Sequence, residues 1–236
     1  MVSNYLTQAA IEVLAGRPFV SWAAARRDLV TPGSASWRGL QAWFTAVVPR
    51  FAHDPAVASW EVMNEPGYML GVDDGSVETA TEVGFLDTFQ ELLHVLGAST
   101  VNAGGRPVFD LGRLSDDEVR QYAAHLDVLD DHLYPQTGSS GEPVGGEADA
   151  ARSVDATAEW FGRVRRVTAR PSFPAMVGEL GTQDQPWMRT ALSLSAEHGW
   201  VVLAWGFDAY DGNAFNAAHR PEVLAILQRA TGAAKP

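Results

Sequence analysis

Residues 59–66 read Ser59-Trp60-Glu61-Val62-Met63-Asn64-Glu65-Pro66. A short apolar segment here ends with an amide, a carboxyl group and a proline in immediate succession. Burying a carboxyl group without a partner is costly, so a glutamate at the end of a buried strand is expected to be paired or to take part in chemistry. The stretch therefore predicts a strand that ends at a functional site.

A second segment of the same kind lies far along the chain, at residues 174–181, with the sequence Pro-Ala-Met-Val-Gly-Glu-Leu-Gly. Its apolar run ends at Glu179 and then at a glycine. Two further strand-like runs, Ser99–Asn102 and Leu126–His132, lie between the two glutamate segments. Because Glu65 and Glu179 are so distant in sequence, only a closed architecture can bring their carboxyl groups together.

Three weaker motifs accompany the two glutamate segments along the chain. Asp131-His132-Leu133-Tyr134-Pro135 follows one strand-like run, the segment from Trp200 to Phe207 contains Trp205, and Arg17–Trp22 precedes them all. Over residues 17 to 207 the chain resembles the clan of retaining glycoside hydrolases built on (β/α)8 barrels. Glycoside hydrolase family 5, with its cellulases and mannanases, is the best-known member. Each motif alone is weak, and their common order makes the resemblance specific.

The resemblance implies a place on the barrel for each segment. Arg17–Trp22 corresponds to the third strand, residues 59–65 to the fourth, residues 174–179 to the seventh and residues 200–205 to the eighth. The His-x-Tyr of residues 132–134 corresponds to the end of the sixth. The expected fold class is thus α/β, an apparently incomplete (β/α)8 barrel in which residues 1–236 form a single catalytic domain.

The resemblance also implies the catalytic roles, with Glu65 as the acid/base and Glu179 as the nucleophile. Glycosidic cleavage needs a proton for the departing oxygen and negative charge near the anomeric carbon, and two carboxyl groups supply both. A separation of about 5–5.5 Å corresponds to a covalent intermediate and retention, whereas about 6.5–9.5 Å leaves room for water and inversion. The competing interpretation of either glutamate is a salt-bridged carboxylate at the barrel end.

Four further residues are predicted to bind substrate. By resemblance, Asn64 hydrogen-bonds the sugar 2-hydroxyl, and Trp205 forms the floor under the reacting sugar. Tyr134 could donate its hydroxyl hydrogen to Glu179 and keep that carboxylate ionised, and His132 could contact sugar hydroxyls or tune Glu65. The alternatives are a cap at the strand-end turn for Asn64, core packing for Trp205, and a satisfied core or rim residue for His132. Weaker candidates for neighbouring subsites are Trp22, Tyr68, Trp187, Phe207, Asp208 and Tyr210, whereas strand alternation predicts that Trp60 is core.

Helical and strand-like patterns alternate along the chain, which favours parallel βα units. Ser115-Asp-Asp-Glu118 is a capping box that predicts a short helix reaching His125. The other expected helices span 4–14, 36–51, 78–96, 151–168, 186–198 and 221–231. Nothing resembles the first two strands, or the arginine that the clan usually carries on the second. Either the natural chain begins upstream or the barrel is open, and we favour the first, which leaves activity of these residues alone in doubt.

Composition excludes several classes of function. The 236 residues are 46% hydrophobic, carry a formal net charge of −12 and contain no cysteine. The negative charge argues against nucleic acid and anionic membrane surfaces as partners, and the absence of cysteine excludes disulfides. No motif calls for a cofactor or a metal. No signal peptide is visible, so localisation and oligomeric state stay open, as does secretion of a longer natural protein.

The expected activity is cleavage of a β-linked glucan, mannan or related glycoside, with an oligo- or polysaccharide as the partner. Two alternatives use the same barrel. In a transglycosylase, a sugar hydroxyl instead of water intercepts the glycosyl-enzyme. In a carbohydrate-binding pseudoenzyme, the aromatic cleft is kept and the chemistry is lost.

Overall fold

The computed structural model describes residues 8–72, 75–106, 113–135, 145–181, 184–204, 222 and 225–226. The chain divides into two compact units. Unit 1 comprises residues 1–129 and 164–173, and unit 2 comprises residues 130–163 and 174–236. In the described parts of the chain, successive strands are separated by helices, and the two strand pairs of known register run parallel.

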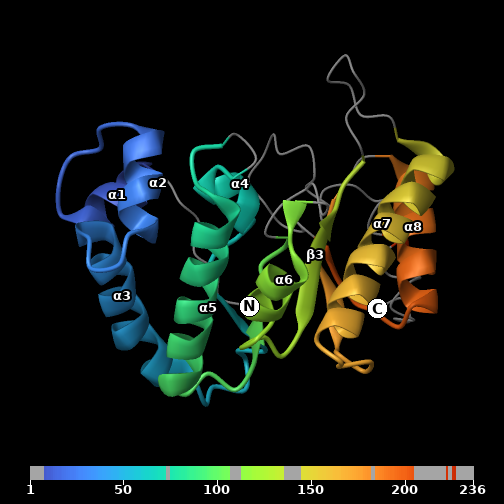
Figure 1. Ribbon diagram of the computed structural model, residues 1–236. Helices are drawn as coiled ribbons and strands as arrows, with labels where there is room; N and C mark the ends of the chain where they lie inside the picture. Colours follow the sequence, from blue (N-terminus) through green and yellow to red (C-terminus); the bar gives the residue numbers. More distant parts are fainter. Residues whose placement is uncertain are drawn as a thin grey trace. The chain divides into compact units, whose positions relative to one another are not determined.

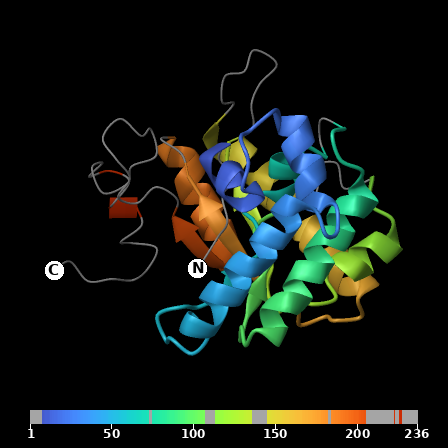
Figure 2. The ribbon, with the colours of Figure 1, turned by 90° about the vertical axis from the view of Figure 1, so that its left-hand side faces the viewer.

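Unit 1 contains most of the helices and one small parallel sheet. Strands β1 (Trp60–Glu61) and β2 (Val101–Asn102) pair with Trp60 opposite Val101 and Glu61 opposite Asn102, and Asn102 bridges onward to Val128. Figure 2 shows the first three helices, in blue, packed together. The helices are α1 (Gln8–Ala15), α2 (Trp22–Val30), α3 (Ala35–Phe51), α4 (Pro66–Leu70), α5 (Thr79–Val95) and α6 (Asp116–Tyr122).

An aromatic cluster joins α3 to α5, which lie side by side in Figure 1. The rings of Trp37 and Phe89 are 4.8 Å apart between centroids, and those of Phe85 and Phe89 are 4.9 Å apart. Phe44 is completely buried beside them. These rings are tilted against one another, and non-parallel aromatic pairs contribute stability beyond the area that they bury. The cluster therefore secures the helical layer of unit 1.

Unit 2 holds a three-stranded sheet in the order β3 (Leu129–Leu133), β4 (Ala175–Leu180) and β5 (Val201–Ala204), the first residue of β3 belonging to unit 1. Helix α7 (Gly146–Val167), whose last turn belongs to unit 1, and helix α8 (Gln185–Glu197) follow β3 and β4 in the chain. The indole of Trp187 on α8 donates to the Asp149 carboxylate on α7 over 3.0 Å, and both side chains are fully buried.

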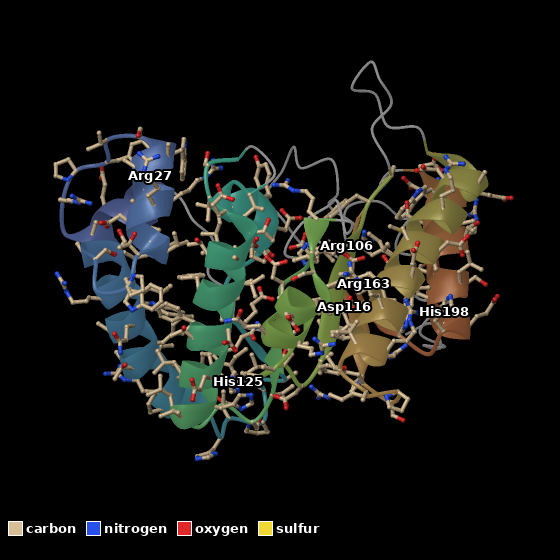
Figure 3. The ribbon with its side chains drawn as sticks, viewed as in Figure 1. Arg27, Arg106, Asp116, His125, Arg163 and His198 are labelled. Atoms are coloured by element: carbon tan, nitrogen blue, oxygen red, sulfur yellow. The ribbon has the colours of Figure 1, made fainter. Side chains whose placement is uncertain are left out.

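Helix α8 is followed directly by an aromatic stack. The imidazole of its C-cap residue His198, labelled in Figure 3, lies parallel to the Trp200 ring at 4.5 Å between centroids. Trp200 also meets Phe161 of α7 edge-on at 5.2 Å. These contacts pack Trp200, the residue before β5, against α7 and the end of α8.

The helices expected at 36–51, 78–96, 151–168 and 186–198 are confirmed with small shifts of their ends, and the capping box of Ser115 opens α6 as predicted. The expected start of the helix at 4–14 lies outside the described residues, within which α1 ends at Ala15, and most of 221–231 lies outside them too. Helices α2 and α4 were not expected. Among the described residues, no helix is both long and apolar enough to cross a membrane.

The expected strand at Arg17–Trp22 is wrong. Ser21 is the N-cap of α2, its hydroxyl accepting from the Ala24 amide at 3.2 Å, and Trp22 already begins the helix. Val20 is 81% exposed, and no strand in the described residues pairs with this segment. A lone apolar run cannot form a strand, because the backbone groups of a strand need a neighbour to hydrogen-bond.

Candidate functional site

Glu179 lies one residue before the end of β4, with only 8% of its surface exposed. The Tyr134 hydroxyl donates to its Oε2 over 2.5 Å, and Nδ1 of His132 lies 3.5 Å from the same oxygen. His132 is in β3, and Tyr134 is the first residue after that strand. Because strand side chains alternate between faces, residues two apart point the same way. The His-x-Tyr spacing therefore delivers both side chains to one carboxylate on the neighbouring strand.

These contacts restrict what Glu179 can do. A phenolic hydroxyl that donates to a carboxylate oxygen stabilises the ionised form and fixes the orientation of the group. A protonated His132 would add an opposite charge beside that oxygen. The arrangement suits an oriented, anionic carboxylate near the C-terminal end of the central strand, which is the state that a nucleophile needs.

Two consecutive aspartates of β3 support the same region, and neither was predicted from the sequence as a site residue. Asp130 accepts a hydrogen bond from the Gly178 amide at 2.7 Å, directly before Glu179. Asp131 accepts from the His132 amide at 3.0 Å and from the Thr157 hydroxyl. Both aspartates are buried. A pair of acidic residues inside an apolar strand was the available signal, since buried carboxylates need hydrogen-bond partners.

Glu65 lies in unit 1 between β1 and α4 and has a strained backbone, with φ 46° and ψ 61°. This left-handed conformation is unfavourable for a non-glycine residue, and a following proline restricts it further. Its amide donates to the Gly104 carbonyl at 2.7 Å, and its carbonyl accepts from the Met69 amide at 2.9 Å. Backbone strain of about 1–3 kcal/mol persists only where surrounding contacts hold it, and it clusters at functional sites.

Arg26 of α2 holds the other end of α4. Its Nε donates to the Met69 carbonyl at 3.0 Å and its Nη2 to the Tyr68 carbonyl at 3.3 Å. The last carbonyls of a helix lack intrahelical partners, and a cation suits the helix C-terminus. Arg27, the next residue and labelled in Figure 3, is exposed. The sequence alone gave no reason to single out Arg26.

The other candidates are distributed as follows. Asn64 is 8% exposed and directly precedes Glu65. Trp60 is core, as predicted, and Trp187 is completely buried, whereas Trp22 and Tyr68 are 44% and 59% exposed. Trp205, Phe207, Asp208 and Tyr210 lie outside the described residues. The structure thus brings His132, Tyr134 and Glu179 together, and the separation of Glu65 from Glu179, which belong to different units, stays a prediction.

No protein-family model matches this chain, and no curated protein matches it. Several solved structures do. The endo-glycoceramidase II from Rhodococcus sp., in a five-membered iminocyclitol complex, has a TM-score of 0.55 at 16% identity, covering 83% of this chain and 46% of that one. Its lactosyl-enzyme intermediate gives 0.52 at 18% identity, covering 79% and 44%. A structure named endoglucanase gives 0.51 at 15% identity, covering 84% and 68%.

The present chain spans about half the length of the endo-glycoceramidase chains that it matches. Identities below one fifth carry information about the fold and not about the substrate. Within that limit, the α/β architecture with parallel strands that the motifs predicted is confirmed. The chain has the fold of part of a (β/α)8 barrel, similar to the endo-glycoceramidase and endoglucanase structures that it matches.

Proposed function

We propose that the protein is a glycosidase that cleaves the O-glycosidic bonds of a β-linked glycan by a two-carboxylate, retaining mechanism. One observation supports this proposal above the others. The buried carboxylate of Glu179, near the end of a parallel strand, accepts a hydrogen bond from the Tyr134 hydroxyl and lies beside His132. We further propose that residues 1–236 form a single, partial catalytic domain, with an oligo- or polysaccharide as substrate.

In the proposed reaction the Glu179 carboxylate attacks the anomeric carbon while Glu65 protonates the departing glycosidic oxygen. The bond to the leaving sugar breaks, and a covalent glycosyl-enzyme forms. Glu65, now ionised, removes a proton from water, which attacks the same carbon and releases Glu179. Two displacements at one carbon retain its configuration. A lactosyl-enzyme intermediate of the structurally similar endo-glycoceramidase supports a covalent step of this kind.

Four side chains would serve the two carboxyl groups. Tyr134 keeps Glu179 ionised and oriented, and His132 contacts Glu179 and sugar hydroxyls. Asn64 would hydrogen-bond the 2-hydroxyl, a contact that can strengthen as the oxocarbenium ion forms. Trp205 would offer an apolar face to the C–H bonds of the sugar. This mechanism uses no metal or cofactor.

Covalent labelling tests the proposal directly. The chain is incubated with a set of activated 2-deoxy-2-fluoro β-glycosides, and mass spectrometry locates any attached sugar. We expect a gain of one sugar per chain on the peptide that contains Glu179. Glu179→Gln should remain unlabelled, whereas Glu197→Gln, a change at an exposed glutamate of α8, should label like the parent.

Absence of label from the correctly folded parent across the whole set would refute the proposed nucleophile. If the same protein still bound oligosaccharides in calorimetry, the carbohydrate-binding alternative would replace the enzyme. If labelling succeeded, incubation with a natural oligosaccharide would separate hydrolysis from transglycosylation, because only the latter yields products longer than the substrate.

A further inference from the structure

Strand β4 contains an irregularity directly beside the proposed nucleophile. Met176 pairs with Val201 and Val177 with Val202, but the next pair is Leu180 with Ala204. From Val177 to Leu180 the chain advances one residue more than β5 does over the same stretch. This is a β-bulge that contains Gly178 and Glu179. Bulges bend a strand and redirect its side chains, and they are enriched next to active sites.

Asp130 takes part in this bulge from the neighbouring strand. Its carboxylate is completely buried and accepts the Gly178 amide over 2.7 Å. Strand alternation places Asp130 on the same face of β3 as His132 and Tyr134, the two residues that contact Glu179. Asp131 faces the other way and bonds Thr157 of α7. One face of β3 therefore contacts both the nucleophile and the backbone that carries it.

The glycine at position 178 fits this arrangement. A Cβ added there would overlap both carboxylate oxygens of Asp130. The overlap could not be relieved cheaply, because the Asp130 side chain is buried and hydrogen-bonded. The carboxylate thus packs against the bare Cα of Gly178, and the two residues act as a pair.

We propose that Asp130 is a positioning residue: by accepting the Gly178 amide it holds the bulge of β4 in the form that aims Glu179 at Tyr134 and His132. This inference rests on the proposed function, because it assigns Glu179 the role of nucleophile. Asp130 itself makes no contact with substrate in this assignment.

A readout that does not depend on activity tests the contact itself. The chain is labelled with 13C at tyrosine Cζ, and the Tyr134 resonance is assigned among the five tyrosines by Tyr134→Phe. Its chemical shift reports the hydrogen bond to Glu179. The shift measured in Glu179→Gln gives the reference value for a Tyr134 without a carboxylate acceptor. We expect Asp130→Val and Gly178→Ala to move the resonance toward that reference, and Asp130→Asn, which keeps an acceptor oxygen, to leave it near the parent value.

Two control variants separate positioning from stability. Thr157→Val removes the buried hydrogen bond of Asp131 on the other face of β3 and should lower stability without moving the Tyr134 resonance. Gly84→Ala in α5, where an added Cβ meets only the Gln121 side chain at 3.9 Å, should raise stability slightly, as alanine does for glycine inside a helix, without moving the Tyr134 resonance. The hydrogen bond from the Gly178 amide to Asp130 can also be checked in the parent protein. Its amide proton should resonate downfield and exchange slowly with solvent.

Kinetics link the contact to the chemistry. In folded Asp130→Val and Gly178→Ala, the rate constant for labelling Glu179 should fall by about 100-fold, the size of effect expected from misplacing a reacting group by about 1 Å. Binding of an unreactive oligosaccharide should change little, and the control variants should label at the parent rate. A merely structural Asp130 would lower the melting temperature without lowering the labelling rate of the folded protein.

Failure of this inference differs from failure of the proposed function. An unprotected Gly178 amide, or a Tyr134 resonance that ignores both Asp130→Val and Gly178→Ala, would overturn the positioning role even if Glu179 is labelled. A parent that is never labelled, but whose Tyr134 resonance responds as expected, would overturn the chemistry while the contact stands.

Discussion

Single residues show how differently the two proposed catalytic groups are held. Glu179 is positioned through its side chain, by the Tyr134 hydroxyl and the nearby His132 imidazole. Glu65 is positioned through its backbone, which is locked in a left-handed conformation by Gly104 and Met69. A nucleophile needs a defined carboxylate orientation, which the Tyr134 hydroxyl supplies to Glu179.

Glu65→Ala is expected to act according to the leaving group. Substrates with poor leaving groups need proton assistance, so their kcat/KM should fall by about 10²–10⁴-fold. Activated aryl glycosides need little assistance and should lose far less. Glu78→Ala, at an exposed N-cap that makes no side-chain capping bond, is the matched control and should behave like the parent on both substrates. Equal losses on both would speak against the acid/base role.

Secondary-structure elements depend on local caps whose contributions can be measured. The Ser115 hydroxyl accepts from the Glu118 amide at 3.2 Å, and the Glu118 carboxylate accepts from the Ser115 amide at 2.7 Å. Ser115→Ala should therefore cost about 1 kcal/mol, which for a protein of this length lowers the melting temperature by about 2–4 °C. Ser115→Asp keeps a capping oxygen and should melt near the parent. If calorimetry gave the same melting temperature for both variants, the stabilising role of the Ser115 cap would be excluded.

The contact between α2 and the start of α3 should make stability depend on pH. Burial raises the pKa of Asp28, but hydrogen bonds from the Ser36 hydroxyl and amide and the charge of Arg17 outweigh it, so the pKa is lowered. The folded state thus favours ionised Asp28. The resulting stabilisation is complete above the unfolded pKa of about 3.9 and is lost as the pH falls through the lower folded value.

Asp28→Asn tests this dependence. At pH 7 the variant should unfold with about 1 kcal/mol less free energy than the parent, the size of a typical net hydrogen bond. The difference should shrink as the pH drops below 4, because parent Asp28 then becomes protonated. Urea unfolding at pH 7, 5 and 3 measures it. A gap of constant size over this range would rule out the ionised carboxylate as its source.

The whole molecule determines the stereochemical outcome, because Glu65 and Glu179 come from segments that are distant in the chain. If folding brings their carboxyl groups to about 5–5.5 Å, the first product keeps the β configuration; about 6.5–9.5 Å would give the α anomer. We expect retention. Proton NMR of the anomeric region, recorded before mutarotation, distinguishes the two, and an initial α product would exclude Glu179 as a nucleophile.

Much of the fold was predictable because its signals are local. A capping box needs only four residues, and helix α6 begins where Ser115 indicated. The His-x-Tyr motif placed two side chains on one face of a strand. In contrast, the apolar segment Arg17–Trp22 looked like a strand but contains the N-cap of α2. An apolar run becomes a strand only beside a partner, and a single sequence does not show which partners exist.

The sequence by itself determined the alternation of helices and strands, the glutamates that end apolar runs, and the spacing that delivers Tyr134 to Glu179. Tertiary structure alone decided that Asp130 accepts the Gly178 amide, that a bulge surrounds Glu179, and that Arg26 caps α4. The physical reason is the distance along the chain over which each interaction acts. Propensity, capping and side-chain alternation act over a few neighbouring residues. The two hydrogen bonds and the bulge depend on segments that come together only after the chain has folded.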